Sequence, residues 1–398
     1  MLPTYQEALA SALSVVTPKS TTELLPLSEV GNRILADNVV ADRDFPPFNR
    51  SQMDGYAVHA SEVEEGVIMQ VIGQVPAGSI YKGDAGPLKS VTIATGAPLP
   101  DCFDAVVPHE KTDNGVDQVV FHCNGAAPGD CVHLQGVDAK ESDVVIETHT
   151  LISPQHIGIC ASAGVHEVPV LSKPRVIIIT SGDEVVAVDA EPQSYQIRNG
   201  NNPMISQAFR AMGCEIVAQH HLQDDPVQTG RCIAESLDGR ADLVVTVGGI
   251  SAGKRDFFPD AFSKSGVELA VKGAKIQPGK PVIVGKHANA VVVGLPGNPV
   301  SALSCCCIFG WPIVRALFGM TTKLPWQIAP LAQDVKPNPK RRSFRPCILA
   351  DGKITLPSWQ GSGDLSHTSA TNGLVQLPEL DGVLEQGTAV SCLAFPWV

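Results

Sequence analysis

Apolar residues in the middle of the chain fall into short continuous runs that are separated by loops rich in glycine and proline. The runs cover residues 176–180, 242–247, 281–284 and 290–293 and consist mainly of Val, Ile and Leu. Continuous apolar runs bounded by turn residues are typical of strands buried on both faces of a sheet. The pattern therefore predicts an α/β domain over residues 173–324.

The N-terminal third carries a different pattern. Residues 5–16 predict a short amphipathic helix, and residues 23–40 predict a turn and a helix that lead into a strand. Strand and helix signals resume over residues 143–170. We expect these segments to form one framing domain of residues 1–44 and 139–172.

Two further regions carry short apolar runs broken by Gly, Pro and Asp, which is typical of β domains. Residues 45–138 predict a small β domain, and residues 325–398 predict a separate C-terminal β domain of barrel or sandwich type. The expected fold class is therefore multidomain α/β plus β, with 398 residues shared among several cores.

Composition narrows the possible partners and the compartment. The net charge of −12 argues against nonspecific binding to nucleic acid or to an anionic membrane, since both need a basic surface. Eleven cysteines without a CxxC pair do not suggest a disulfide framework, which favours a reducing cytoplasm.

Residues 287–314 carry no formal charge, but the Pro296-Gly-Asn-Pro299 sequence would break a membrane-spanning helix. We expect no transmembrane segment and no signal peptide.

Three loops in the α/β domain have the composition of a phosphate-binding site. They are GGISAGKRD, QPGKPVIVG and GLPGNPVSA, and each adjoins a predicted strand. Glycine lets backbone N–H groups approach an anion, and ligands of open α/β sheets bind where strands end and loops begin. The first loop departs from the P-loop pattern because Arg255 takes the place of the hydroxyl residue, so a P-loop NTPase is not expected. Asn298 and Pro299 fit the start of a helix.

Individual charged residues near these loops each have two interpretations. Glu184 suits either a metal or hydroxyl ligand at the sheet edge or an acid at a helix N-terminus, and the two are evenly balanced. Asp224 and Asp225 suit a metal pair or, more simply, a helix cap before proline. Lys280, between two prolines, suits an oxyanion site, although a surface lysine in a turn is slightly more common. Asp54, before a glycine, also suits an ordinary turn.

Six motifs, in order, resemble those of the molybdopterin molybdotransferases, a MoeA-type family that includes the E domain of gephyrin and its plant counterpart. The resemblance covers nearly the whole chain. The motifs are Ser51-Gln-Met-Asp-Gly-Tyr-Ala-Val58, Ala94-Thr-Gly-Ala-Pro-Leu-Pro100 with Asp104-Ala-Val-Val107, Ser181-Gly-Asp-Glu184, Gly248-Gly-Ile-Ser-Ala-Gly253 with Asp256, Pro278-Gly-Lys-Pro281, and Gly294-Leu-Pro-Gly-Asn-Pro-Val-Ser-Ala302.

The resemblance implies a central three-layer α/β domain that binds adenylylated molybdopterin, flanked by the small β domain and a C-terminal β-barrel-like domain. Molybdate is inserted into the dithiolene and AMP leaves, with Mg²⁺ as cofactor. The resemblance also implies a homodimer, in which the small β domain of the partner closes the site, and a molybdenum enzyme is the expected acceptor of the product.

Site residues follow from the same resemblance, position by position. Seven are catalytic by analogy and seven bind the ligand, and two of the acids are the expected metal ligands. The catalytic set is Asp54, Thr95, Asp138, Glu184, Asp224, Asp256 and Lys280; the binding set is Gly248, Gly249, Ser251, Gly253, Pro296, Pro299 and Ser362; the metal ligands are Glu184 and Asp256.

The chain departs from the family pattern where basic residues are expected. Gln277 and Gly273 replace lysines near Lys280, Pro346 replaces an arginine with Arg345 one place earlier, and residues 132–135 lack an arginine-rich run. These losses keep a second hypothesis open, in which the chain is a noncatalytic or divergent molybdopterin-binding paralogue or scaffold. A third and weaker hypothesis is the adenylylating step itself, against which the extra domains on both sides argue.

Overall fold

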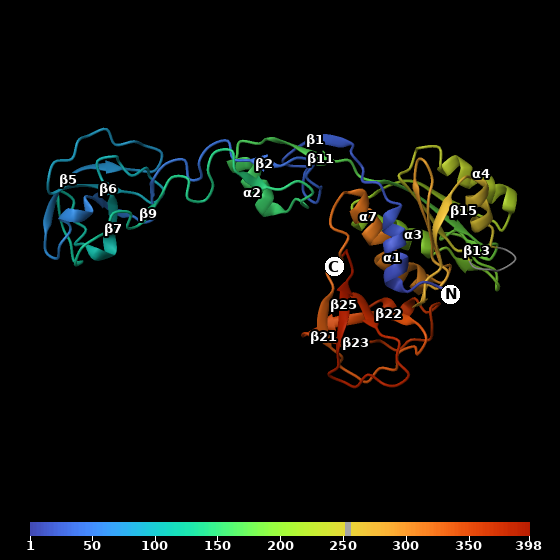
Figure 1. Ribbon diagram of the computed structural model, residues 1–398. Coiled ribbons are helices and arrows are strands. Elements are labelled where there is room, and N and C mark those ends of the chain that lie inside the picture. Colours follow the sequence, from blue (N-terminus) through green and yellow to red (C-terminus); the bar gives the residue numbers. More distant parts are fainter. Residues whose placement is uncertain (251–255) are drawn as a thin grey trace. The chain divides into compact units, whose positions relative to one another are not determined.

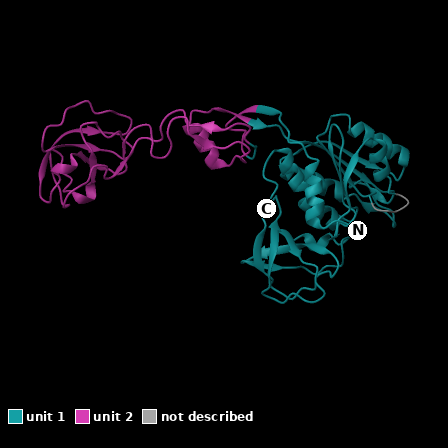
Figure 2. Cartoon of the chain, viewed as in Figure 1, with its two compact units in different colours: residues 1–23, 32–34, 170–398 teal, residues 24–31, 35–169 magenta. Residues whose placement is uncertain are grey.

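The computed structural model describes residues 1–250 and 256–398. The chain forms two compact units, shown in different colours in Figure 2. Unit 1 consists of Met1–Glu23, Asn32–Ile34 and Val170–Val398, and unit 2 consists of Leu24–Gly31 and Leu35–Pro169. Residues 173–398 therefore lie wholly in unit 1 and residues 45–138 wholly in unit 2.

Unit 1 contains a six-stranded sheet with the order β15-β12-β16-β20-β19-β17. The first four strands in this order are parallel, and β19 and β17 are antiparallel to their neighbours. The strands are β12 (Arg175–Ser181), β15 (Glu215–Leu222), β16 (Leu243–Val247), β17 (Glu268–Lys272), β19 (Ile283–Lys286) and β20 (Val291–Leu295). The predicted runs thus form strands of one mixed sheet.

Helices cover both faces of this sheet. Helices α4 (Pro226–Ser236) and α5 (Phe258–Lys264) contact each other, and Ile177 of β12 lies in the core cluster that they share. Ile178, whose side chain points to the opposite face because strands alternate, is also fully buried. Helices α3 (Asn201–Ala211) and α6 (Pro299–Cys305) contact each other as well as strands of the sheet. The predicted three-layer α/β domain is confirmed (Figure 1).

The reversed strand β19 brings the loop before it to the edge at which the parallel strands end. Ile283, the first residue of β19, pairs with Gly294 near the end of β20, and Val247 at the end of β16 pairs with Leu295. The loop that carries Lys280 precedes β19, whereas the other two glycine-rich loops follow β16 and β20. All three loops therefore meet at one edge of the sheet, an arrangement that the sequence analysis, which gave no strand directions, did not predict.

One long apolar helix lies in the core of unit 1. It runs through α6, a π-helical turn η3 (Cys306–Gly310) and α7 (Trp311–Leu317). By length and composition Pro299–Leu317 could cross a membrane, but 89% of the apolar window is buried inside the protein. Burial at this level is what a core helix of a globular domain shows. The three consecutive cysteines in this helix are buried thiols, and all eleven cysteines of the chain are free.

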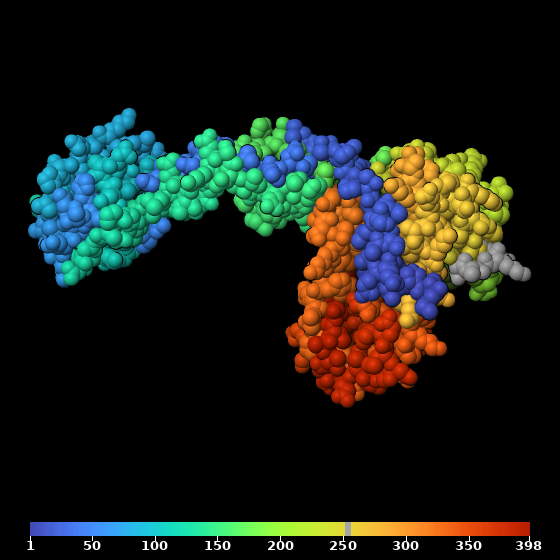
Figure 3. Space-filling model, in the orientation of Figure 1, coloured from blue at the N-terminus to red at the C-terminus, as the bar shows by residue number. Residues whose placement is uncertain are grey.

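The C-terminal β domain packs beside the α/β domain within unit 1. Its strands are β21 (Gln327–Pro330), β22 (Arg342–Ala350), β23 (Lys353–Thr355), β24 (Gly373–Leu377) and β25 (Ala389–Ala394), and β18 (Ile276–Gln277) extends its sheet. The N-terminal helix α1 (Tyr5–Ser14), blue in Figure 3, contacts α7 and β17. Tyr5 packs edge-on against Phe309 and Phe344, at centroid distances of 5.7 and 4.7 Å. Helix α1 therefore links the α/β domain to the C-terminal sheet.

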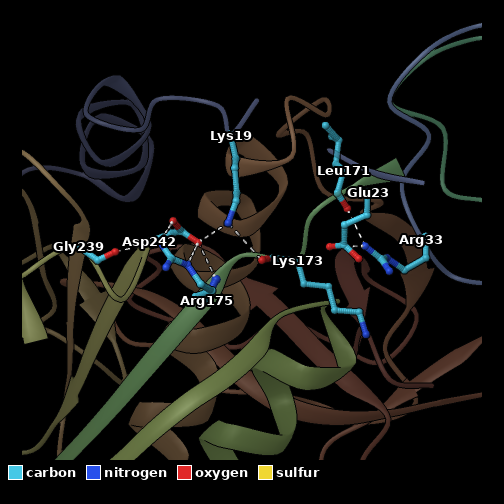
Figure 4. Close-up of polar contacts among 8 residues, drawn as sticks. All are labelled: Lys19, Glu23, Arg33, Leu171, Lys173, Arg175, Gly239 and Asp242. Atoms are coloured by element: carbon cyan, nitrogen blue, oxygen red, sulfur yellow. Dashed lines mark hydrogen bonds and ion pairs between the residues drawn. The ribbon is translucent and has the colours of Figure 1, made fainter. Parts of the chain in front are cut away.

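A network of charged residues fixes the chain where it enters the α/β domain (Figure 4). Asp242 accepts hydrogen bonds from Lys19 Nζ at 2.7 Å, from the Arg175 amide at 2.8 Å and from Arg175 Nη2 at 3.1 Å. Beside it, Arg33 pairs with Glu23 at 3.1 Å and donates to the Leu171 carbonyl. Burial raises the pKa of Asp242, but hydrogen bonds from Arg175 and Lys19 outweigh this effect, so that its pKa is lowered.

Unit 2 contains a five-stranded sheet with the order β7-β4-β6-β5-β8. The strands are β4 (Gly55–Val58), β5 (Ile68–Val75), β6 (Lys89–Ile93), β7 (Ala105–Pro108) and β8 (Gln118–Val120), and every residue of β4 and β7 is buried. The rest of unit 2 contains β3 (Arg50–Ser51), β9 (Val132–His133), β10 (Val144–Ile146), which pairs with β2, and α2 (Pro154–Ser162). Two short 3-10 turns, η1 (Ala60–Glu62) and η2 (His109–Lys111), flank the five-stranded sheet.

The helix predicted within residues 23–40 is wrong. This segment instead forms β1 (Thr22–Pro26), turns and β2 (Val39–Val40), and β1 pairs with β11 (Glu167–Leu171). Apolar residues of this segment such as Leu35 and Val39 are buried, although their backbone is not helical. Tertiary burial therefore outweighs local helical propensity here.

Candidate active site

A cavity of about 1230 Å³ opens at the sheet edge where the three loops meet. The loops after β12, β15, β16 and β20 contribute to its walls, as does the loop before β19. Residues 359–363 and Arg341 of the C-terminal β domain line it as well. A cleft of this size is typical of a site for a small molecule or cofactor.

Two glycines allow the backbone to approach the ligand closely. Gly249 has φ +59°, and a Cβ there would lie 2.8 Å from a ring carbon of Phe258 and 2.9 Å from Ser181 Oγ. Gly279, next to Lys280, has φ +102°, and a Cβ there would collide with Cys305 Sγ. Only glycine fits both positions without displacing neighbours. The backbone at these two positions therefore packs directly against Phe258, Ser181 and Cys305, which leaves no room for a side chain.

Three predicted acids line this one cavity. Glu184 follows β12, Asp224 follows β15, and Asp256 lies beyond the loop after β16. Asp225 is not part of the group, because it caps α4 by accepting from the amides of Val227 and Gln228 at 2.7 and 2.9 Å. Asp225 therefore fits the helix-cap interpretation, whereas Asp224 lines the cavity.

The remaining described candidates of the α/β and C-terminal domains line the same cavity. They are Gly248, Gly249, Lys280, Pro296, Pro299 and Ser362. Asn298 occupies the N-cap position of α6 as expected, but its side chain does not cap the helix. Its Nδ2 donates instead to Ser362 Oγ at 2.8 Å, and the Val300 amide donates to the Ser362 carbonyl at 3.1 Å. These bonds attach the C-terminal loop to the start of α6. Two predicted binding residues, Ser251 and Gly253, lie outside the described residues.

Asp54 and Thr95 lie together in unit 2. Asp54 Oδ1 accepts from the Thr95 amide at 2.7 Å and from the Thr95 hydroxyl at 3.1 Å. These two hydrogen bonds lower the pKa of Asp54 because they favour its ionised form. The pair is exposed, so an ionised carboxylate is presented at the surface of the small β domain.

Asp138 belongs to a second polar group of unit 2. Its Oδ1 lies 3.1 Å from His133 Nε2, and His133 Nδ1 lies 3.4 Å from Arg50 Nη2. Arg50 and His133 are paired across strands β3 and β9. Arg50, Arg43 and Asp138 line a cavity of about 1080 Å³ within unit 2. Arg50 therefore supplies a positive charge in the neighbourhood where the arginine-rich run is lost.

Several cavity residues escaped the sequence analysis, among them Arg198, Arg341 and Trp359. The amide of Ile197 donates to the Glu184 carbonyl at 2.8 Å. Arg198, the next residue, therefore lies near this predicted acid. The basic run of residues 340–342 was a usable signal for Arg341, whereas no signal identified Trp359. Gln277, which replaces a family lysine, also lines the cavity, and Asn338 Nδ2 donates to its Oε1 at 2.6 Å.

Three family models together match most of the chain. The MoeA N-terminal region (domain I and II) matches residues 3–164. The probable molybdopterin binding domain matches residues 177–316, and the MoeA C-terminal region (domain IV) matches residues 328–395. The second of these models covers the three loops and all three acids of the cavity.

Similar proteins are found along the whole length of the chain. It is 34% identical over 388 residues to molybdopterin molybdenumtransferase 2 of Mycobacterium tuberculosis, with 94% of each chain covered. It is 31% identical over 399 residues to molybdopterin molybdenumtransferase of Haemophilus influenzae, with 98% of each covered. The solved structure of the molybdopterin biosynthesis moeA protein from Pyrococcus horikoshii OT3 matches with a TM-score of 0.86 at 25% identity, over 99% of this chain and 100% of that chain.

Proposed function

The chain belongs to the molybdopterin molybdenumtransferase family, and from this premise we propose that it inserts molybdate into adenylylated molybdopterin with release of AMP. It is accordingly a transferase of molybdenum cofactor biosynthesis. The observation that supports the proposal best is the convergence of Glu184, Asp224, Asp256 and Lys280 on one cavity with glycine-rich walls. These residue types suit a ligand that carries a pyrophosphate.

We propose Mg²⁺ as the cofactor, held by Glu184 and Asp256. Mg²⁺ keeps several waters and is usually bound through one or two carboxylates together with substrate phosphates. Both carboxylates line the cavity, and among the described residues no group of three or more His, Cys, Asp or Glu is close enough to hold a metal alone. The donor set therefore fits an ion shared between protein and pyrophosphate. When bound, such an ion neutralises charge on the phosphate oxygens.

The protein's own groups bind and orient the ligand. The Gly248 amide donates to the Leu295 carbonyl at 3.0 Å, so the backbone N–H of Gly249, which also lines the cavity, is the proposed donor to phosphate oxygens. The exposed ammonium of Lys280 stabilises negative charge on the leaving AMP, and Arg341 adds a second cation to the cavity wall. No covalent nucleophile on the protein is required.

We further propose a homodimer in which unit 2 of one copy completes the cavity of the other. Asp54, Thr95 and Asp138 then serve the reaction from the partner copy. Support comes from their exposure and from the ionised state of Asp54, since a charged surface group is suited to meet a ligand held by another surface. The other proposed properties are location in the cytoplasm and transfer of the product to a molybdenum enzyme.

The function is tested with purified protein, adenylylated molybdopterin, molybdate and Mg²⁺. We expect AMP release that depends on both molybdate and Mg²⁺, measured by chromatography, and transfer of molybdenum to the dithiolene, measured by metal analysis. Binding of the adenylylated ligand without AMP release would reject the transferase and favour the noncatalytic paralogue. Formation of adenylylated molybdopterin from ATP would favour the adenylylating step instead.

The shared site is tested by mixing two inactive variants. In a dimer of Glu184→Gln and Asp54→Asn chains, one site carries both changes and the other carries neither. When the two variants associate at random, about half of the dimers contain one chain of each kind. One of the two sites in each such dimer is intact, so about one quarter of wild-type activity is expected. If each chain completes its own site, mixing restores no activity, and the proposal of a shared site fails while the transferase itself can stand.

A further inference from the structure

Trp359 is the one aromatic side chain among the described residues that line the cavity of unit 1. It lies immediately before the loop of residues 360–363, which also lines the cavity. The loop is attached to the α/β domain through the hydrogen bonds of Ser362 to Asn298 and Val300. The indole therefore belongs to the wall of the site rather than to a separate surface.

Side chains behind the indole hold its ring in place. The Arg345 guanidinium carbon lies 4.7 Å from the Trp359 ring centre, and the His367 ring lies 6.3 Å away at an interplanar angle of 32°. His367 Nδ1 in turn lies 3.5 Å from Asp364 Oδ2. In the part of the chain that the structure describes, neither Arg345 nor His367 lines the cavity. The guanidinium therefore covers a side of the ring that is turned away from the cavity.

The indole N–H is prepared for an acceptor that the described protein does not supply. Trp359 Nε1 is buried and has no hydrogen-bond partner among the described residues. A buried donor without a partner is costly, and native structures rarely keep one without a reason. The N–H lies in the plane of the indole, so the acceptor would be an atom of the ligand beside the indole rather than an atom of a ring stacked on its face.

We propose that Trp359 is the stacking platform for a planar nitrogen heterocycle of the ligand, with Arg345 and His367 as positioning residues behind it. The inference rests on the proposed function, because the proposed substrate carries two such rings, adenine and the pterin. Aromatic side chains bind nucleobase-like rings by stacking, and the cation behind the indole fixes the plane of the ring. The polar, glycine-rich loops at the sheet edge then serve the phosphates, and the C-terminal wall serves the ring.

The test measures binding of separate fragments to the full chain. The probes are AMP, 6-hydroxymethylpterin and ribose 5-phosphate, which lacks a base, and affinities are measured by calorimetry and by quenching of tryptophan fluorescence. The variants are Trp359→Leu, which removes the ring, and Trp359→Phe, which keeps a ring but lacks the N–H. Trp397→Leu is the matched control, because this tryptophan is partly exposed and packs on Phe395 at a centroid distance of 4.9 Å.

We expect Trp359→Leu to weaken binding of a ring-bearing probe by roughly tenfold to a hundredfold. Trp359→Phe should lie between this variant and the wild type, and the affinity for ribose 5-phosphate should not change. Loss of AMP binding alone assigns the platform to adenine, and loss of pterin binding alone assigns it to the pterin. Circular dichroism and thermal unfolding verify that each variant is folded, and Trp359→Phe keeps the test decisive if the leucine variant does not fold.

Three outcomes would overturn the platform. They are unchanged affinity of Trp359→Leu for both ring-bearing probes, an equal loss for ribose 5-phosphate, and failure of the wild type to bind either ring-bearing probe. The proposed function fails separately, if the wild type binds AMP through Trp359 but releases none from adenylylated molybdopterin. Conversely, if the wild type releases AMP from adenylylated molybdopterin and Trp359→Leu binds both ring-bearing probes with wild-type affinity, only the stacking platform is rejected.

Discussion

Units 1 and 2 carry the same kinds of candidate residues but present them differently. In unit 1, Glu184, Asp224 and Asp256 reach a single cavity from three separate loops. In unit 2, Asp54 and Asp138 are exposed, and each is bonded to a neighbour in its own unit, Thr95 and His133 respectively. Unit 1 therefore offers a cavity that acids from several loops line together, whereas unit 2 offers separate charged groups that are each bonded to a neighbour. The difference indicates that ligand binding and completion of the reaction are separable properties of the chain.

The largest effect is expected at the acids that line the cavity of unit 1. Glu184→Gln removes a charge that is proposed to hold Mg²⁺ and should lower the rate of AMP release roughly 1000-fold, because electrostatic groups at a reacting phosphate dominate such rates. The rate is measured at saturating ligand and Mg²⁺. Glu191→Gln makes the same chemical change at an exposed residue that does not line the cavity, and it serves as the control. An active Glu184→Gln enzyme would remove this acid from the mechanism.

A smaller and different effect is expected at the exposed pair. Asp54→Asn should lower the rate of AMP release roughly 100-fold, because the polar groups at positions 54 and 95 would no longer be correctly placed for the reaction. The affinity of unit 1 for AMP should stay at the wild-type value. Since hydrogen bonds from Thr95 lower the pKa of Asp54, its carboxylate remains ionised down to pH values below the usual aspartate range. A loss of AMP affinity equal to the loss of rate would erase the distinction between the two units.

The charged network at Asp242 tests whether unit 1 can be weakened alone. Asp242→Asn leaves Arg175 and Lys19 without their anion and should destabilise unit 1 by about 2 kcal/mol. Hydrogen exchange measured by mass spectrometry should rise in peptides of β12 and β16 and stay unchanged in peptides of β4 and β7. Asp238→Asn, whose carboxylate pairs with Arg240 at an exposed position, is the control. Equal changes in both units would show that the units unfold together.

The same network predicts a pH dependence of stability with a definite sign. The folded-state pKa of Asp242 is lowered, so its contribution is complete above the unfolded-state value near 4 and is lost as pH falls through the lower folded value. Denaturant unfolding between pH 7 and pH 2 should show this loss only below about pH 4 in the wild type. In Asp242→Asn the loss of stability over this pH range should be smaller than in the wild type, because the contribution of Asp242 is absent.

A roughly tenfold loss of anion affinity is expected from Arg341→Ala, because a charged hydrogen-bonding group leaves the cavity wall. The measurement is calorimetric titration with AMP, repeated at raised salt, where the difference should shrink. Lys340→Ala changes an exposed neighbour that does not line the cavity and should have no comparable effect. Equal losses of AMP affinity in the two variants would indicate that the overall positive charge of this region attracts the anion, rather than a specific contact with Arg341.

The smallest effect is expected from restoring a lysine at Gln277. Gln277→Lys adds an ammonium to the cavity wall but removes the hydrogen bond from Asn338. The affinity for AMP should rise by about threefold to fivefold at low salt. Asn338→Ala removes the same hydrogen bond without adding charge and separates the two contributions. A weaker-binding Gln277→Lys variant would show that the amide pair matters more than the missing charge.

The sequence predicted the fold of unit 1 better than it predicted the wall of the cavity. Continuous runs such as residues 242–247 are buried on both faces, so their composition alone identifies them as central strands. The direction of β19 could not be read, because an antiparallel strand in the interior has the same composition as a parallel one. The loops adjoin strands as predicted, but the strand pairing that brings them to one edge was not predicted.

The residues that were missed come from distant parts of the chain. Trp359 and Arg341 reach the cavity only because the C-terminal β domain packs on the α/β domain, and no local pattern encodes that contact. Asp224 was distinguished from Asp225 only by the hydrogen bonds that make Asp225 a helix cap. Local signals therefore find groups on loops, whereas packing decides which of them share a site.

The direction of β19 has a practical consequence for labelling this enzyme. The turn between β19 and β20, closed by the hydrogen bond from the His287 amide to the Ala290 carbonyl, lies at the end of the hairpin opposite to the loop that carries Lys280. Ala288 and Asn289 in this turn are exposed. An epitope or a fluorophore inserted there would extend into solvent, so the protein could be immobilised or tracked while its ligand loops keep their native lengths.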